Sequence, residues 1–408
     1  MISDEKLEMS DKPTYEWGEG VYTLLSWFKQ DRVKGARVVV AGAGALGNEV
    51  VKGLALFGVG HITVVDFDRI ELSNLTRSVL FREQDAYDRR YKADVVAQRA
   101  MEINPQIHVV PIVGNLFSEV GFGLYRRADV VIGCLDSRLA RYQLNRLCMR
   151  AGKSWIDGSI ENLTGVVRVF TPGVSCYECG LSRQEFNNIM LRTGCADVAH
   201  RQTSAGRVAT TPVSASIIGA MQVQEAMKII HHDESHSAPF KTLEGRMLRY
   251  EGMTCDTSTY RIASWKRNCP AHERWDNVVS CRRLSSSMPV KQVLSILREE
   301  LKVGAVEINM RNNKFVDVII SDRPEKEFRV MVPESRLDDL IESDREMRLL
   351  SYKTLFHKHF YENIDLDFPY QDLTLNQIGI PALDVLQVST DRGMYFVELT
   401  GDESLFYH

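Results

Sequence analysis

Residues 36–68 read ARVVVAGAGALGNEVVKGLALFGVGHITVVDFD, and this stretch decides the fold. The apolar run 37–41 predicts a strand. Residues 46–57 then have the spacing of an amphipathic helix, and 61–65 is a short β-branched strand. A strand, a turn, a helix and a second strand in this order make a βαβ unit, which belongs to a parallel sheet.

The turn between the first strand and the helix carries Gly42, Gly44 and Gly47 as G-x-G-x-x-G. The first glycine permits a tight turn, the second lets the backbone approach phosphate, and the third lets helix and strand pack closely. Asp66 ends the second strand about 20 residues later, where an acid binds ribose hydroxyls. The pattern predicts a nucleotide site with phosphate at the helix N-terminus. It leaves NAD, FAD and ATP open, and a plain glycine turn is the alternative.

Composition limits the classes of protein to consider. The 408 residues suggest two or three domains, and 44% hydrophobic with 25% charged residues is typical of a globular protein with an ample core. A net charge of −4 gives no electrostatic case for nucleic acid or an anionic membrane. No apolar run approaches the ~20 residues of a membrane span. The N-terminus is charged and acidic, unlike a signal peptide, so we expect a cytoplasmic protein.

The chain divides into three parts by pattern. Residues 1–35 are a polar lead-in with one amphipathic helix candidate at 21–28. Residues 36–283 carry the βαβ unit and all eight cysteines, and within them 171–211 is predicted to be irregular. Residues 284–408 are predicted to form a smaller α+β unit, whose position and coarse strand–helix mix fit a ubiquitin fold by analogy.

Alternation of elements sets the fold class. Further strands are expected at 107–113, 129–133, 154–156 and 165–170, and helices at 92–103, 138–151, 212–230 and 290–301. This alternation predicts a doubly wound, Rossmann-like, mostly parallel sheet.

Polar residues after the second strand narrow the nucleotide site. Asp66 and Asp68 form D-x-D, S-N-L-T-R follows at 73–77, Lys92 opens a predicted helix, and Asp136 follows the strand 129–133. In this combination the sequence resembles the ubiquitin-activating superfamily, which includes the ThiF/MoeB/HesA-type adenylyltransferases and the activating enzymes for ubiquitin-like proteins. The resemblance covers about residues 36–275.

The resemblance implies a reaction and a set of roles. The C-terminal carboxylate of a small β-grasp protein attacks the α-phosphate of ATP, which gives an acyl-adenylate and pyrophosphate. A carboxylate is already a nucleophile, so the site must mainly offset negative charge. Arg77 and Lys92 match the phosphate cations, Asn74 orients a phosphate or the metal shell, and Asp136 matches the Mg²⁺ ligand. Asp68 contacts the nucleotide or only braces its loop. Singly, each residue could be an ordinary surface or capping residue.

Two cysteine half-sites predict a metal centre. Cys176 and Cys179 form C-x-x-C, and Cys269 and His272 form C-x-x-H about ninety residues later, an arrangement typical of structural zinc. Members of the superfamily often close this site with C-P-x-C, whereas this chain has CPAH. Cys255 or Cys281 could replace His272, and an unmetallated remnant is the alternative.

Cys195 is the candidate for covalent chemistry. It lies in a polar segment before the predicted helix 212–230, where transferring members of the superfamily place a thioester cysteine. Arg192, His200 and Arg201 are near it in sequence and would lower its pKa; a loop cysteine without a role is the alternative. Cys134 and Cys148 fall on apolar positions and are expected to be packing residues.

These features lead to one hypothesis and several alternatives. We expect an ATP-, Mg²⁺- and Zn²⁺-dependent homodimeric enzyme that adenylates a ubiquitin-like protein, carries it on Cys195 and hands it to a conjugating enzyme at 284–408. A single adenylation domain favours a bacterial conjugation pathway. The alternatives are a sulfur-carrier adenylyltransferase without thioester transfer, a non-catalytic scaffold and a nicotinamide dehydrogenase. No N-terminal R-x-x-R-Q segment is present to supply a partner arginine, since Arg32 is the single arginine in 1–35.

Overall fold

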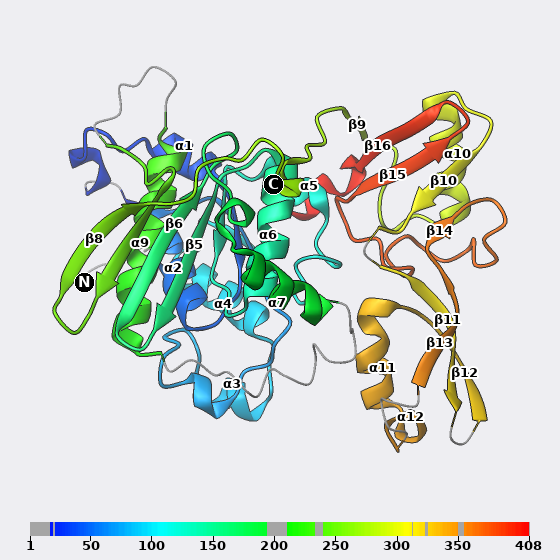
Figure 1. Ribbon diagram of the computed structural model, residues 1–408, viewed down its shortest axis with the longest axis horizontal. Coiled ribbons are helices and arrows are strands. Elements are labelled where there is room, and N and C mark those ends of the chain that lie inside the picture. Colours follow the sequence, from blue (N-terminus) through cyan, green and yellow to red (C-terminus); the bar gives the residue numbers. More distant parts are fainter. Residues whose placement is uncertain are drawn as a thin grey trace, which may run out of the picture.

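The computed structural model describes residues 17–18, 21–193, 210–232, 240–311, 313–322, 325–349 and 355–407. Its largest element is an eight-stranded sheet with helices on both faces, and two smaller sheets lie beside it (Figure 1).

The large sheet has the strand order β3-β2-β1-β4-β5-β6-β7-β8. Strands β3 to β5 pair in parallel, and β6 to β8 continue the sheet antiparallel. The strands are β1 (Arg37–Ala41), β2 (His61–Val65), β3 (His108–Ile112), β4 (Val130–Gly133), β5 (Trp155–Glu161), β6 (Thr164–Phe170), β7 (Arg246–Glu251) and β8 (Asp256–Arg261). The chain is therefore a mixed α/β protein with a large, mostly parallel central sheet, as predicted.

The antiparallel end of the sheet departs from the simple alternation expected from sequence. Only Asn162 and Leu163 connect β5 to β6. A connection of two residues can join only antiparallel strands, since a parallel return needs a long crossover. The sheet therefore changes direction at this turn.

Alternating side chains of β1 supply both cores of the large sheet. Val38 and Val40 join the core beneath α2 (Ala45–Phe57), α4 (Lys92–Ile103) and α9 (Pro212–Ile230). Val39 and Ala41 join the core beneath α5 (Phe122–Arg127), α6 (Arg138–Ala151) and α7 (Arg183–Thr193). A strand buried on both faces reads as a continuous apolar run, as RVVVA does.

A five-stranded sheet and a three-stranded sheet make up the C-terminal part. The first has the order β14-β10-β15-β16-β9, and the second has the order β12-β11-β13. Their strands are β9 (Val278–Cys281), β10 (Val306–Asn309), β11 (Phe315–Asp322), β12 (Glu325–Pro333), β13 (Leu355–Tyr361), β14 (Asn363–Ile364), β15 (Val385–Thr390) and β16 (Gly393–Leu399). Helix α10 (Val290–Leu301) packs on the first sheet, and α11 (Leu337–Ser343) with α12 (Arg345–Leu349) packs on the second. A ubiquitin fold and a domain boundary at 283/284 stay predictions.

Two buried carboxylates of the C-terminal part bind α5. Arg126 and Arg127 both pair with Glu398 of β16, whose side chain is 1% exposed. The backbone N–H of Phe122 donates to Asp384 Oδ1 at 2.8 Å. Both acids are buried and both are partnered by the large domain, so this junction is held firmly.

Backbone also approaches backbone closely at this junction. A Cβ added to Gly121 would lie 2.0 Å from the carbonyl oxygen of Ala382. Leu383, Val385 and Phe406 are buried in the same core as α5 and α6. The hydrophobic core of the large sheet therefore extends into the C-terminal part.

The helix predicted at 21–28 does not form. The structure has one 3₁₀ turn, η1 (Tyr22–Leu24), and helix α1 begins later and spans Gln30–Gly35. Tyr22 stacks on Phe57 with ring centroids 5.6 Å apart, and Phe28 packs against His231 at 5.3 Å. Aromatic packing onto α2 and the end of α9 outweighs the local helical pattern.

The segment 171–211, predicted to be irregular, contains α7. A reciprocal capping box starts this helix: Ser182 N–H donates to Glu185 Oε2 at 3.0 Å, and Glu185 N–H donates to Ser182 Oγ at 3.2 Å. The S-x-x-E signature was present in the sequence and indicated a helix start.

Within the described residues, none of the helices has both the length and the apolar character that crossing a membrane requires.

The buried Glu398 gives a test of the junction. Glu398→Ala should lower the free energy of unfolding by about 3 kcal/mol, because two guanidinium groups lose their buried partner. Glu403→Ala is the matched control: Glu403 also pairs with Arg127, at 3.5 Å, but is 40% exposed, and should cost below about 1 kcal/mol. Denaturant midpoints measure both, and equal values would contradict the account of the junction.

Candidate nucleotide site and metal centre

The predicted nucleotide residues lie at the carboxyl ends of three neighbouring strands. In register, Ala41 of β1 pairs with Val65 of β2 on one side and with Gly133 of β4 on the other. The glycine turn, the Asp66–Asp68 loop and the turn that carries Asp136 therefore leave the sheet together. Strand order reverses between β1 and β4, and such a switch point is where open α/β sheets bind ligands.

Each glycine of the turn has a separate geometric reason. Gly42 has φ +99°, and a Cβ there would lie 2.4 Å from the carbonyl oxygen of Cys134. A Cβ at Gly47 would lie 2.0 Å from the carbonyl oxygen of Gly42. Gly44 borders open space, with no heavy atom within 4 Å of its Cβ position. The first and third glycines are required by the protein itself, and the second leaves room for a ligand.

Asn48 is a site residue that the sequence reasoning missed. It is fully buried in α2, and its Nδ2 donates to the carbonyl oxygens of Ala43 and Gly44, both at 2.9 Å. Its Oδ1 accepts the N–H of Leu80 at 2.9 Å. This side chain holds the glycine turn against the segment that follows Arg77. An asparagine directly after G-x-G-x-x-G, before an apolar run, was the signal.

Asp66 binds the glycine turn with one carboxylate oxygen and its own loop with the other. Its Oδ2 accepts the N–H of Ala43 at 2.7 Å, and its Oδ1 accepts the N–H of Asp68 at 2.8 Å. Burial raises the pKa of its carboxyl group, and the nearby Lys92 ammonium opposes that rise. In the structure Asp66 braces the loop, and its contact with ribose stays a prediction.

Lys92 and Asp68 form an ion pair at the start of α4. Lys92 Nζ lies 2.6 Å from Asp68 Oδ2, and the Lys92 N–H donates to the Asp68 carbonyl at 2.9 Å. The lysine side chain is 12% exposed and the aspartate side chain 51%. Lys92 is thus fixed beside the Asp66–Asp68 loop, and among the described residues the ion pair with Asp68 uses one of its three ammonium protons, so the others could bind a phosphate.

Arg77 and Asn74 lie on the continuation of the same loop. Arg77 is half-buried, and its Nη1 donates to the carbonyl oxygen of Ser73 at 2.9 Å. Asn74 ends the 3₁₀ turn η2 (Leu72–Asn74), and its Oδ1 accepts the N–H of Glu71 at 3.0 Å. The described contacts of both residues brace the loop, and their contacts with phosphate stay predictions.

Asp136 projects from the turn between β4 and α6. Ser137 caps α6 by accepting the N–H of Ala140 at 3.0 Å, so Asp136 is not the cap of that helix. Its side chain is exposed at the carboxyl edge of the sheet. An exposed carboxylate here suits Mg²⁺, which takes one or two protein carboxylates together with substrate phosphates.

The predicted metal residues come together. Cys176, Cys179, Cys269 and His272 place their ligand atoms within 4.8 Å of one another. Three thiolates and one imidazole at this spacing fit the tetrahedral sites that hold structural zinc. Cys255 lies exposed at the β7–β8 turn, and Cys281 is buried in the core of the five-stranded sheet. The geometry therefore selects His272 over either cysteine.

Neighbouring donors support thiolates at this centre. Asn145 Nδ2 donates to Cys176 Sγ at 3.2 Å, and the Lys266 N–H donates to Cys179 Sγ at 3.3 Å. Such hydrogen bonds orient metal ligands. Burial raises the pKa of the Cys176 thiol to about 12 and also raises the pKa of Cys269. A bound zinc ion would have to displace those protons.

The remaining cysteine predictions concern Cys134 and Cys148, which are described, and Cys195, which is not. Burial raises the pKa of both Cys134 and Cys148, as expected for packing residues. Cys195 lies outside the described residues, as do His200 and Arg201. Helix α9 begins after it at Pro212, capped by Thr211 as predicted, so the thioester role of Cys195 stays a prediction.

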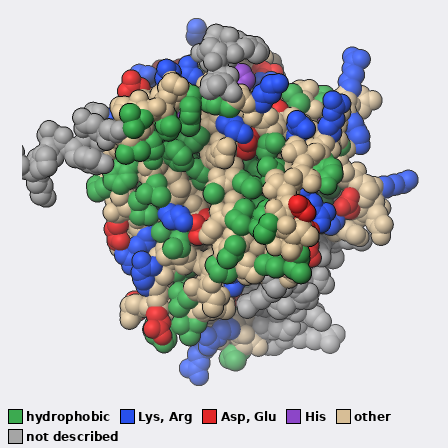
Figure 2. Space-filling model, turned by 90° about the vertical axis from the view of Figure 1, so that its left-hand side faces the viewer, with side chains coloured by type: hydrophobic (Ala, Val, Ile, Leu, Met, Phe, Trp, Pro, Cys, Tyr) green, Lys and Arg blue, Asp and Glu red, His purple; other side chains and the backbone are tan. Residues whose placement is uncertain are grey.

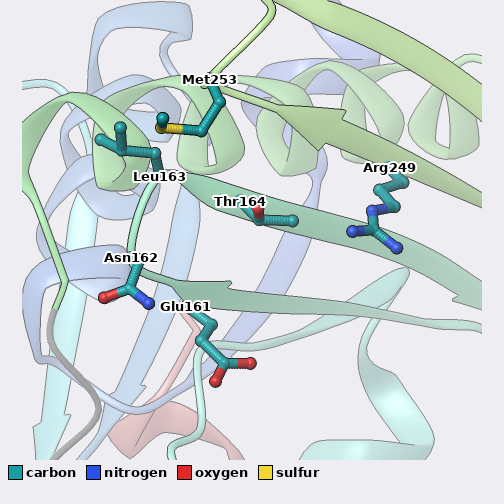
Figure 3. A pocket seen from close by; sticks show the side chains of 6 residues that line it. All are labelled: Glu161, Asn162, Leu163, Thr164, Arg249 and Met253. Carbon is teal, nitrogen blue, oxygen red and sulfur yellow. The ribbon is translucent and has the colours of Figure 1, made fainter.

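A pocket of about 480 Å³ lies at the turns of the antiparallel strands (Figure 3). It is lined by Glu161, Asn162, Leu163, Thr164, Arg249 and Met253. Gly252 N–H donates to the Leu163 carbonyl at 3.0 Å, and Ser214 Oγ of α9 donates to the Asn162 carbonyl at 3.0 Å. The pocket thus adjoins the N-terminal end of α9.

Comparison with protein-family models matches residues 19–271 to the ThiF family. The chain belongs to the ThiF family. The superfamily predicted from the motifs is confirmed, and with it the enzyme class: the chain is an ATP-dependent adenylyltransferase.

Named relatives of this ThiF chain are adenylyltransferases and an activating enzyme. Molybdopterin-synthase adenylyltransferase of Escherichia coli is 32% identical, over 55% of this chain and 83% of the relative. Sulfur carrier protein adenylyltransferase of Thermus thermophilus is 30% identical, over 59% of this chain and 83% of the relative. SAMP-activating enzyme E1 of Haloferax volcanii is 31% identical, over 59% and 82%. The structure of E. coli MccB with ATP aligns with a TM-score of 0.46 at 25% identity, over 60% of this chain and 68% of that chain.

The four metal-binding candidates give a direct test. The purified chain should contain one zinc ion, and Cys176→Ser should lose it together with several degrees of melting temperature. Cys255→Ser, which changes an exposed cysteine away from the cluster, should keep both. Zinc affinity should rise with pH between about 6 and 8, because binding displaces protons from thiols whose pKa values are raised. Elemental analysis and competitive chelation measure these quantities, and zinc retained by Cys176→Ser would rule out this ligand set.

Proposed function

We propose that this ThiF-family chain adenylates the C-terminal carboxylate of a small carrier protein. A carboxylate oxygen forms a bond to the α-phosphorus of ATP, the bond between the α-phosphorus and its bridging oxygen breaks, and pyrophosphate leaves. One observation carries the proposal: the glycine turn, the Lys92–Asp68 pair and Asp136 meet at the switch point between β1 and β4. The names of the relatives support a small carrier as the acceptor.

The site residues would act mainly by placing charge. Lys92 and Arg77 would donate to the phosphates and offset the approach of a second anion, the carrier carboxylate. Asp136 would hold Mg²⁺ with the phosphates; when bound, the ion supplies neutralisation of the leaving pyrophosphate. Asn48 and Asp66 would keep the glycine turn in place. The four-residue cluster beside α6 would hold zinc structurally, because a full set of protein ligands leaves no open position.

The carrier tail would run along the carboxyl edge of the sheet. Asp157 of β5 pairs with Gly133, and Glu161 lies four residues further along the strand. Asp157 and Glu161 are therefore about 13 Å apart at the rise of an extended chain. A short extended tail would therefore reach from the pocket in Figure 3 to the end of β4. Figure 2 shows hydrophobic side chains gathered on the face with the antiparallel end of the sheet, where the body of a carrier would dock.

Later steps stay predictions. The relatives named for sulfur carriers and molybdopterin synthase support adenylation without a thioester, the alternative named from the sequence, better than transfer through Cys195. Recruitment of a conjugating enzyme by the C-terminal part, and a homodimer, stay predictions as well.

Carrier-dependent exchange between ATP and labelled pyrophosphate tests the reaction. The chain should catalyse exchange only with Mg²⁺ and a β-grasp carrier that ends in glycine. Asp136→Asn and Lys92→Met should each lower the exchange rate by about 10²-fold or more, since each removes charge at the phosphates. Lys52→Met is the matched control, because Lys52 pairs with Glu49 on α2.

Two results of this assay would contradict the proposal. One is exchange that needs no carrier, and the other is full activity of Asp136→Asn. The same mixture tests Cys195: a carrier adduct that thiols reverse and that Cys195→Ala abolishes would establish the thioester.

The docking surface has its own test. Met253→Glu, at a side chain 77% exposed on the pocket rim, should raise the KM for the carrier by about tenfold and leave the KM for ATP unchanged, since a buried contact becomes an unpaired charge. Met394→Glu is the control, at a methionine 54% exposed on β16. Equal effects of the two substitutions on the carrier KM would exclude the pocket as the docking place.

A further inference from the structure

Beneath the exposed Asp136 lies a buried charge cluster. Asp157, at 0% exposure, accepts hydrogen bonds from two arginines. Arg141 Nε donates to its Oδ1 at 2.8 Å, and Arg168 Nε donates to its Oδ2 at 2.9 Å. Two guanidinium groups share one carboxylate, so the cluster carries a net positive charge; the Arg141 side chain is 9% exposed and the Arg168 side chain 24%. Replacing buried ion groups of this kind by well-packed hydrophobic residues is often neutral or stabilising, so stability alone does not account for the cluster.

Only one of the two arginines reaches the turn that carries Asp136. Arg141 Nη2 donates to the carbonyl oxygen of Leu135 at 2.5 Å, and Leu135 directly precedes Asp136. Arg168, from β6, has no described contact with that turn. Its guanidinium lies instead near the rings of Phe170 and Tyr177. The two arginines therefore share a partner but differ in what else they hold.

The turn is held at other points as well. Cys134 N–H donates to the Ala41 carbonyl at 2.8 Å, and Gln222 Nε2 of α9 donates to the Gly133 carbonyl at 3.0 Å. These bonds fix the end of β4. The bond from Arg141 fixes the carbonyl of Leu135, two residues after Gly133 and directly before Asp136.

We infer that Arg141 is a positioning residue for the Asp136 carboxylate: it fixes the Leu135 carbonyl and so sets where Asp136 meets the metal–nucleotide complex. This rests on the proposed function, which gives Asp136 its role. Asp157 in turn holds the Arg141 guanidinium at the correct angle. Arg141 makes the two bonds from separate nitrogens of its planar fork, Nε and Nη2, whereas a lysine ammonium would have to make both from one nitrogen.

Magnesium dependence of nucleotide binding tests the inference without any carrier. Calorimetry on the full chain would give the half-saturating Mg²⁺ concentration for ATP binding. Arg141→Lys should raise it by about tenfold, the usual effect of losing a residue that orients a metal ligand, and saturating Mg²⁺ should restore binding. Arg168→Gln is the matched control: it breaks the other bond to Asp157 and should leave the Mg²⁺ requirement within about twofold.

Asp157→Asn gives a second variant that keeps the shape of the cluster should Arg141→Lys fold poorly. It should raise the Mg²⁺ requirement by about threefold, because Arg141 loses a charged anchor. Equal Mg²⁺ profiles for Arg141→Lys and Arg168→Gln, or an unchanged profile for Asp157→Asn, would overturn the inference. Failure of the proposed function is separate: it would show as an unchanged profile for Asp136→Asn or as no binding of Mg–ATP by the unaltered chain.

Discussion

The register of β1 between β2 and β4 is the constraint on which the rest of the structure depends. Gly42 N–H donates to the Val65 carbonyl, and Cys134 N–H donates to the Ala41 carbonyl, both at 2.8 Å. These two bonds bring three loops from distant parts of the chain to one edge. A shift of one residue in either pairing would turn every side chain of β1 to the opposite core. The site is therefore placed by backbone hydrogen bonds, and the side chains of the loops only complete it.

In these loops, polar side chains near the carboxyl edge of the sheet are held in place by hydrogen bonds and an ion pair to neighbouring groups. Asn48, Asp66 and Asp68 each bond to a neighbouring backbone group or side chain. Arg77 and Asn74 do the same within their own turn. Catalysis by placed charge needs little reorganisation at the moment of reaction, so a site that is already braced suits adenylate chemistry. Asp136 is the exception: the carbonyl before it is held, while its carboxylate faces solvent.

The sequence predicted the parallel core, the family and the residues of the metal cluster, because each has a local or motif signal. Helix α4 begins at Lys92, and α9 begins at Pro212, as their patterns indicated. Long-range polar contacts had no such signal. The bond from Arg141 to Asp157 joins a helix and a strand that read as ordinary amphipathic and apolar segments. The helix expected at 21–28 failed for the same reason, since partners distant in sequence decide its conformation. Cys195 lies outside the described residues, so its thioester role stays a prediction from the sequence.

The junction at α5 bears on how this chain can be divided. Strand β9 precedes residue 284 yet pairs with β16, and Trp275 stacks on Phe396 with ring centroids 4.2 Å apart. Cutting the chain at 284 would leave β9 without its partner strand β16 and Trp275 without Phe396. It would also leave Arg126 and Arg127 without Glu398. Loss of activity in such a truncation would report damage to the enzyme rather than absence of a recruitment module. The part of the chain that could be removed as a unit is instead the three-stranded sheet, which has a small core of its own and lies between β10 and β14 in the sequence.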